Sequence, residues 1–247
     1  MIIPDATHDM LSLSVFERSK YSFQSLASTM DSKESGEPFV QYDTTEIGRL
    51  YIRPFWDTPG DLEGECYRSY IADHPEFTLQ VRQGVNDRLN VVVEQLPDQF
   101  NVVVKAGFRP YQVQVAVLEA FIAESERANP NWTAAQHLSQ ARTYVADPRI
   151  VCPPHTTGGA IDVDLIDSRS GLPVDMGCPP NTDSDIAFLH SDLLSAEQYG
   201  NRMVLLDAML AAGFAPNPYE WWHYQYGETY WAAFYGHSET LYSIVYT

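Results

Sequence analysis

The chain has 247 residues, of which 45% are hydrophobic and 19% are charged, a composition that indicates a globular protein and excludes a disordered one. Its 15 basic and 33 acidic residues give a formal charge of −18 at pH 7. A surface of this charge repels phosphate backbones, so nucleic acid is not an expected partner.

The first half of the chain predicts a mixture of loops, helices and strands. Residues 1–60 are rich in Ser, Thr, Asp and Pro and indicate loops with one or two strands that cover another part of the molecule. Apolar residues recur at helical spacing in 77–96, so we expect one helix there. The β-branched segment 101–105 predicts a strand, and 111–127 predicts a helix.

The next segments continue this mixture. A further helix is expected near 133–145, before Asp147-Pro148. Polar and apolar residues alternate over 160–166, which predicts a strand with Asp162 and Asp164 on the same face.

The last segments decide the fold class. Residues 202–214 predict a helix that ends at Gly213, and the aromatic segment 219–227 predicts a strand. Helices and strands alternate without regular βαβ units. We therefore expect a single α+β domain, with a mostly antiparallel sheet flanked by helices.

Three observations bear on the compartment. No apolar run reaches the roughly 18 residues of a membrane span, and the N-terminus lacks the basic start and apolar stretch of a signal peptide. The three cysteines, Cys66, Cys152 and Cys178, are too few for a disulfide framework and contain no CxxC pair. We expect a cytoplasmic protein with no membrane contact.

Three residues could together bind a metal ion. His155 lies seven residues before Asp162 at the start of a predicted strand, and His223 lies in the aromatic segment. Two imidazoles and a carboxylate leave the fourth tetrahedral position of a zinc ion open, as in catalytic sites. The alternative is that Asp162 is a solvated strand residue and His223 belongs to an aromatic core.

Glu220 and Arg109 could complete a catalytic site. Glu220 precedes His223 by three residues and is the natural base for a water molecule. Residues three apart in a regular strand face opposite sides, so Glu220 is expected on a turn before the strand. Arg109 follows a predicted strand, where a guanidinium could bind a carboxylate or an oxyanion, or could form only a surface salt bridge.

Taken together and in this order, four segments resemble the zinc D-Ala-D-Ala dipeptidases of the vancomycin-resistance type: GFRP, HTTGGAIDVDLID, VDMG and EWWH. The resemblance runs from about residue 101 to residue 226. It implies an α+β fold shared with D,D-carboxypeptidases and the Hedgehog signalling domain. It also implies a single zinc dipeptidase domain, which we divide into an N-terminal covering segment, 1–75, and a catalytic core, 76–247.

The same resemblance implies roles for the five candidate residues. The zinc ligands would be His155, Asp162 and His223. Glu220 would act first as the base and then as the acid, and Arg109 would stabilise the transition state. The implied partner is a small dipeptide.

Two departures from the family pattern concern the substrate and leave the zinc ligands unchanged. Pro153 stands where the family usually has a serine, and Asn181 stands where it usually has an acidic residue for the substrate's ammonium group. Asp183 or Asp185 could replace that acid.

Two other functions stay open at this point. One is a D,D- or L,D-carboxypeptidase that acts on peptidoglycan stem peptides. The other is a zinc-binding module without catalysis, which would need neither Glu220 nor Arg109.

Overall fold

A six-stranded sheet forms the centre of the protein, in a computed structural model that describes residues 3–246. Its strand order is β2-β3-β5-β6-β8-β7, and β1 and β4 pair in a separate two-stranded sheet. The strands are β1 (Phe39–Tyr42), β2 (Glu46–Ile47), β3 (Leu50–Ile52), β4 (Leu79–Arg82), β5 (Phe100–Ala106), β6 (Ala160–Asp167), β7 (Ala215–Asn217) and β8 (Glu220–Gln225). Only β3 and β5 run parallel within the large sheet, so the expected α+β class with a mostly antiparallel sheet is confirmed.

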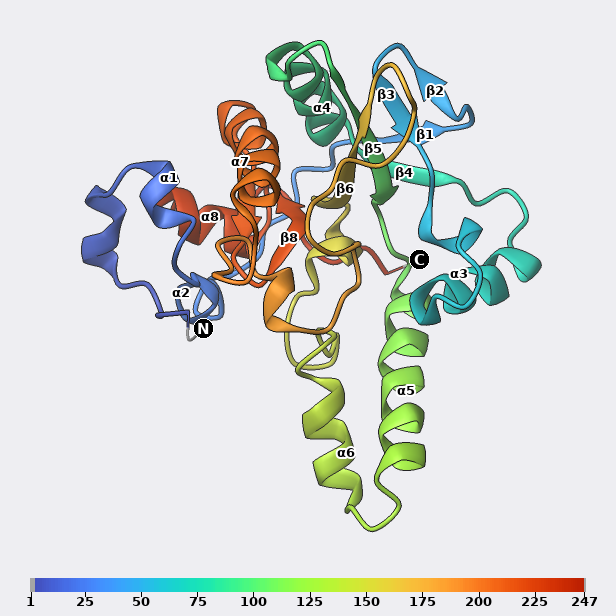
Figure 1. Ribbon diagram of the computed structural model, residues 1–247. Helices are drawn as coiled ribbons and strands as arrows, with labels where there is room; N and C mark the ends of the chain where they lie inside the picture. The colour runs from blue at the N-terminus through green and yellow to red at the C-terminus, as the bar shows by residue number, and fades with distance from the viewer. Residues whose placement is uncertain (1–2, 247) are drawn as a thin grey trace.

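Helices surround the sheet unevenly. The α-helices are α1 (Val15–Arg18), α2 (Gln24–Ala27), α3 (Leu62–Asp73), α4 (Gln83–Gln95), α5 (Tyr111–Ala128), α6 (Ala134–Ala141), α7 (Ala196–Ala211) and α8 (Thr229–Tyr235). Short 3₁₀ turns are η1 (His8–Ser12), η2 (Phe55–Asp57), η3 (Pro154–Thr157) and η4 (Asp185–Ala187). Helices α5 and α6 form a hairpin that projects from the body (Figure 1). Across residues 3–246, no helix combines the length and the apolarity needed to cross a bilayer.

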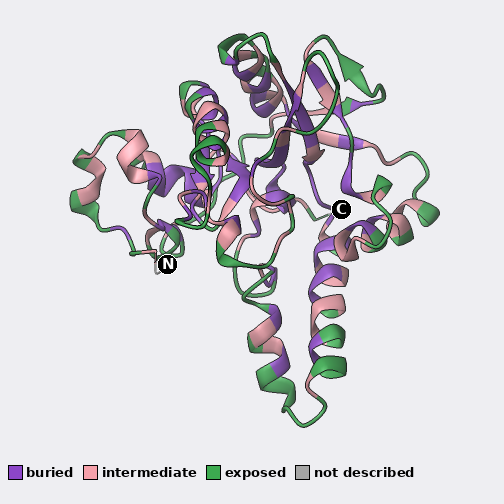
Figure 2. Ribbon diagram, in the orientation of Figure 1, coloured by how far each residue is buried: buried purple, intermediate pink, exposed green. Residues whose placement is uncertain are grey.

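The two faces of the central sheet have different environments. On β6, Ile161, Val163 and Leu165 are fully buried in a large apolar cluster with residues of α4 and α7. A second, smaller cluster joins α3, α5 and α6 around Tyr67 and Val117. Figure 2 shows buried residues concentrated in the sheet and exposed ones at the far end of the α5–α6 hairpin. The alternate residues of β6 therefore face away from the large cluster.

Several element boundaries differ from the sequence expectations. The single helix expected over 77–96 is wrong at its start, because residues 79–82 form β4, which pairs with β1, and the helix begins at residue 83. The helix expected near 133–145 ends already at Ala141. Helix α7 starts at Ala196, six residues before the expected start, because Ser195 and Gln198 form a capping box there.

The N-terminal segment contributes to the sheet itself. Strand β3 pairs with β5, and this places residues 50–52 beside residues 102–104. Helix α3 then packs against α5. Residues 3–75 therefore include two strands of the central sheet, β2 and β3, and a helix of the second apolar cluster, besides their surface loops.

A buried arginine fixes the long loop between β6 and α7. Arg202 is fully buried, and its guanidinium donates hydrogen bonds to the backbone carbonyls of Met176, Ile186 and Phe188, at 2.7–2.8 Å. Three charge-assisted bonds to one loop give that loop a defined path. The loop carries Asn181, Asp183 and Asp185, the residues singled out for substrate contact.

Candidate metal centre

The site begins with a pair of residues on neighbouring strands. Asp162 on β6 lies directly opposite His223 on β8 in the antiparallel register, although 61 residues separate them in the chain. Side chains of directly opposed residues project from the same face of a sheet. On β6 this is the face away from the large apolar cluster, so both groups are free to meet a third ligand.

The third residue comes from the turn that precedes β6. His155 lies in η3, and Gly158 follows it with φ +76°, a conformation that glycine adopts without steric cost. A Cβ atom on Gly159 would lie 2.3 Å from the carbonyl oxygen of Tyr226, so this position also has no room for a side chain. The paired glycines therefore let the chain turn tightly against β8 and place His155 over the strand ends.

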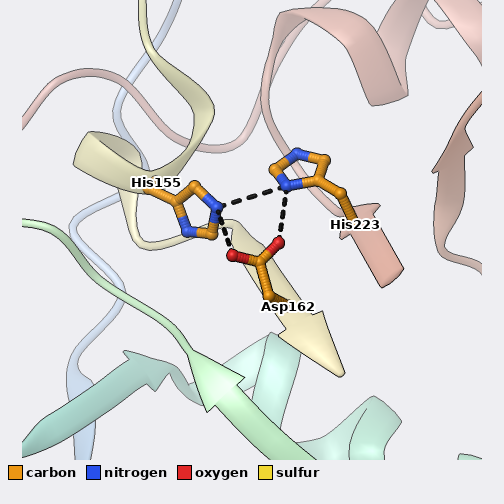
Figure 3. Close-up of side chains that lie close together, drawn as sticks. All are labelled: His155, Asp162 and His223. Atoms are coloured by element: carbon orange, nitrogen blue, oxygen red, sulfur yellow. Dashed lines mark hydrogen bonds and ion pairs between the residues drawn. The ribbon is translucent and has the colours of Figure 1, made fainter. Parts of the chain in front are cut away.

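The three side chains converge, as the sequence hypothesis requires (Figure 3). Their candidate ligand atoms all lie within 4.8 Å of one another. His155 Nε2 is 3.2 Å from His223 Nδ1 and 3.3 Å from Asp162 Oδ2, and His223 Nδ1 is 2.9 Å from Asp162 Oδ1. All three residues are buried.

The outer nitrogen of His155 supports a metal role. Its Nδ1–H donates to the carbonyl oxygen of Gly107 at 2.9 Å. That bond fixes the tautomer in which Nε2 has a free lone pair directed at the other two residues, the usual arrangement of a ligating histidine. The donor set and its orientation therefore fit a divalent ion.

The charges also suit a cation. Burial alone would raise the pKa of Asp162, but the two adjacent imidazoles hold it well below its usual range, so the carboxylate is charged at neutral pH. Burial opposes a charged His223, yet its hydrogen bond with Asp162 raises the pKa of that imidazole. The carboxylate of Asp162 favours a proton on the neighbouring imidazole, and it favours a metal ion in the place of that proton for the same electrostatic reason.

Glu220 lies beside the three residues. It is the first residue of β8 and follows the turn after Asn217, which corrects the expectation that it precedes the strand. The β7–β8 pairing jumps from Tyr224 opposite Pro216 to Glu220 opposite Asn217, so β8 is irregular between these points and strict alternation does not apply. The Glu220 Oε2 atom is 3.9 Å from His223 Nδ1.

The Glu220 carboxylate is held in place and is partly shielded from water. Asn217 Nδ2 donates to its Oε2 atom at 3.0 Å, and the side chain is 36% exposed. Desolvation raises the pKa of Glu220, and the negative charge of Asp162 acts in the same direction, while His223 lowers it. A raised pKa makes this carboxylate a stronger base than an exposed one.

Arg109 lies in the loop after β5 and is tied to the same turn as His155. Its backbone N–H donates to the carbonyl oxygen of His155 at 3.0 Å. The side chain is buried, not part of a surface salt bridge, and its guanidinium bonds to Glu63 and Gln114. Burial opposes the charge on Arg109, but Glu63 raises the pKa of the guanidinium, which therefore stays protonated.

A cavity of about 1030 Å³ joins these groups. Its lining includes the three candidate ligands, Glu220 and Arg109. The lining also includes the two residues that depart from the family pattern, Pro153 and Asn181, and the two acids that could replace the missing one, Asp183 and Asp185. Asn181 has φ +62°, and its Nδ2 donates to Asp61 Oδ2 at 3.1 Å. Asn181 thus joins the loop after β6 to the start of α3.

Two cavity residues were not predicted from the sequence. Glu63 at the start of α3 and Gln114 on α5 both bond the Arg109 guanidinium. No local motif marks either residue. The only available signal for Glu63 was a carboxylate in the first turn of a helix, and that pattern is common on protein surfaces.

Comparison with known proteins assigns the family. The family described as D-ala-D-ala dipeptidase matches residues 89–239, more than half of the chain. The chain therefore belongs to this metallopeptidase family, and the resemblance drawn from the four segments is confirmed. A D-alanyl-D-alanine dipeptidase from Synechocystis sp. (strain ATCC 27184 / PCC 6803 / Kazusa) is 25% identical over 231 residues, which cover 81% of this chain and 86% of that protein.

Two solved structures are similar to part of the chain. One is a point mutant of the vancomycin resistance D,D-pentapeptidase VanY from the VanB-type cassette, in complex with Zn(II), with 19% identity over 60% of this chain and 74% of that chain and a TM-score of 0.40. The other is VanYB in complex with D-alanine-D-alanine, with 17% identity, 64% and 79% coverage and a TM-score of 0.42.

The geometry predicts which histidines are needed for metal. We expect His155→Ala and His223→Ala each to weaken zinc binding by at least about 100-fold, since loss of a group that only orients a ligand already costs up to about that much. The measurement is zinc content after dialysis against a metal-buffered solution. His137→Ala is the matched control, because His137 is also buried but bonds Ser125 at 2.9 Å and lies outside the cavity lining. Zinc retained by both site variants would contradict the assignment.

Proposed function

We propose that this member of the D-Ala-D-Ala dipeptidase family hydrolyses the peptide bond of D-Ala-D-Ala or a similar small dipeptide, with one zinc ion and a glutamate base. The convergence of His155, Asp162 and His223 within 4.8 Å carries the proposal. The name of the Synechocystis relative supports the same reaction.

Zinc would be held by His155 Nε2, His223 Nδ1 and the carboxylate of Asp162. When bound at such a site, zinc polarises a carbonyl group and lowers the pKa of bound water to about 7. The carboxylate and the two neutral imidazoles leave it a net positive charge, and the buried setting strengthens its effect on a neighbouring carbonyl.

Glu220 performs the proton transfers. Its carboxylate takes a proton from the attacking water and then gives that proton to the nitrogen of the leaving amine. Asn217 fixes the Oε2 atom of the group at 3.0 Å, and the other oxygen, Oε1, would accept the proton of the water. Its raised pKa suits both steps, because the group must accept the proton and then give it up.

Arg109 stabilises the transition state. Negative charge develops on the carbonyl oxygen of the scissile bond as water adds. A protonated guanidinium that is already fixed in a buried site meets this charge without reorganisation. Because the interaction strengthens as the charge forms, it lowers the barrier more than it tightens substrate binding.

The charge of the cavity suits a substrate with a free ammonium group. The lining carries more acidic than basic side chains, with Arg109 and Arg142 the basic members. Asp183 and Asp185, either of which could replace the acidic residue that the family usually has at the position of Asn181, both line the cavity. These carboxylates favour the amino end of a dipeptide through their field.

One observation favours a second candidate, a carboxypeptidase that acts on longer peptides. The volume of about 1030 Å³ lies just above the range for small-molecule sites, which is roughly 300–1000 Å³. Part of the lining is apolar and extends along α5 and beyond α6, at Val117, Phe121 and Val145. A peptide longer than two residues could occupy that extension.

A direct comparison of substrates tests the proposed reaction. We expect the zinc-loaded enzyme to release D-alanine from D-Ala-D-Ala with a higher kcat/KM than from a stem pentapeptide that ends in the same two residues. A chelator should abolish the release, and added zinc should restore it. Faster cleavage of the pentapeptide would identify a carboxypeptidase, and zinc binding without cleavage of any D- or L-dipeptide would identify a module without catalysis.

The base is tested by Glu220→Ala. We expect kcat to fall by about 10²–10⁴-fold, the usual contribution of a positioned acid–base group, while zinc content is unchanged. Glu126→Ala, an exposed glutamate on α5, is the control and should retain full activity. Near-normal turnover in Glu220→Ala would rule out Glu220 as the base.

A further inference from the structure

We infer that Glu63 is a positioning residue for the reaction: it fixes the Arg109 guanidinium beside the three candidate ligands. The inference rests on the proposed function of Arg109 in the transition state. It concerns a residue from the N-terminal segment, outside the matched range 89–239.

The ion pair between Glu63 and Arg109 is buried at the arginine and largely buried at the glutamate. Glu63 Oε1 accepts from Arg109 Nη2, and the two side chains are only 14% and 6% exposed. An exposed pair would contribute little, but removal of one partner from a buried pair leaves an uncompensated charge. The position of the guanidinium therefore depends strongly on this carboxylate.

A second acceptor holds the opposite side of the guanidinium. Gln114 Oε1 accepts from Arg109 Nη1 at 2.9 Å, and Gln114 Nε2 donates to the carbonyl oxygen of Ala146 at 2.7 Å. Both terminal nitrogens of the arginine thus have a fixed partner. Two partners on different elements, α3 and α5, determine both the place and the plane of the group.

Helix α3 is itself anchored at the point from which Glu63 projects. Asp61 caps the helix by accepting from the backbone N–H of Gly64 at 2.7 Å, and its other carboxylate oxygen accepts from Asn181 at 3.1 Å. The cap and the contact across the cavity fix the first turn of the helix. Glu63 therefore presents its carboxylate from a rigid support.

The position of the Glu63 carboxylate is not explained by a contribution to folding stability. Its carboxylate is desolvated and lies close enough to Asp162 for the two negative charges to repel, and both effects raise the pKa of Glu63, while Arg109 lowers it. A well-packed apolar pair would stabilise the same place at least as well as a buried ion pair. We therefore attribute the presence of an acidic residue at position 63 to its role in orienting the Arg109 guanidinium.

The expected kinetic effect is on kcat. Without Glu63 the guanidinium would have to be ordered as the transition state forms, so it would stabilise the developing negative charge less. Substrate binding would be little affected. We expect kcat to fall by about 10-fold in Glu63→Gln and by about 100-fold in Glu63→Ala, less than or comparable to the loss of one oxyanion donor. Glu63→Asp keeps the charge and should recover part of the loss.

Two controls accompany these variants. Zinc content and KM should stay at the wild-type level in all three. Glu65→Gln is the matched control, because Glu65 lies in the same turn of α3 but pairs with Arg68 and is 60% exposed, so its kcat should not change.

A double-mutant cycle separates positioning from a merely structural role. If Glu63 acts through Arg109, Glu63→Gln should have almost no further effect on kcat in the Arg109→Ala background. A structural role would lower kcat equally in both backgrounds and would overturn the inference. A raised KM with unchanged kcat would also overturn it, because that result indicates direct contact between Glu63 and the substrate's ammonium group.

Arginine NMR tests the positioning without any substrate. Hindered rotation should give separate signals for the Arg109 terminal N–H groups in the wild type and averaged signals in Glu63→Gln. Separate signals that persist in the variant would overturn the inference. If the wild type cleaves no dipeptide, or Arg109→Ala is fully active, the proposed function fails, and the kinetic role of Glu63 fails with it; the NMR result still decides whether Glu63 orders the arginine.

Discussion

The pairing of Asp162 with His223 across β6 and β8 is the contact on which the rest of the site depends. It places a carboxylate and an imidazole 2.9 Å apart on one face of the sheet, while the opposite face of β6 packs in the large apolar cluster. Two groups buried in this way need a compensating partner. His155 supplies another nitrogen at hydrogen-bond distance, and a cation at the same point would satisfy all three groups together.

Hydrogen bonds that involve the backbone place Arg109 beside the turn that carries His155. The loop after β5 is joined to the His155 turn by two hydrogen bonds, one from the imidazole to Gly107 and one from the Arg109 backbone to His155. The arginine is thereby placed next to the candidate ligands by the same turn that positions one of them. Under the proposed function, movement of that turn would disturb both metal binding and transition-state stabilisation.

The sequence predicts those parts of the site that depend on residues close together in the chain. The alternation in 160–166 locates Asp162 on a strand face, and His155 lies seven residues before it, at the start of that strand. The contribution of Glu63 could not be predicted, because it depends on packing of α3 against α5, which no spacing in the chain specifies. The helix expected over 77–96 is wrong over residues 79–82 for a different reason: apolar Leu79 and Val81 alternate there with polar residues, and this short strand pattern is completed by pairing with β1.

We propose that one metal ion is bound by His155, Asp162 and His223, and X-ray absorption of the zinc-loaded protein is the decisive measurement. This ligand set predicts a single zinc environment with nitrogen and oxygen ligands at about 2.0–2.2 Å, including two imidazoles. In His223→Ala the imidazole signal should fall by half or the zinc should be lost. A zinc ion with sulfur ligands, or a spectrum unchanged by that substitution, would contradict the claim.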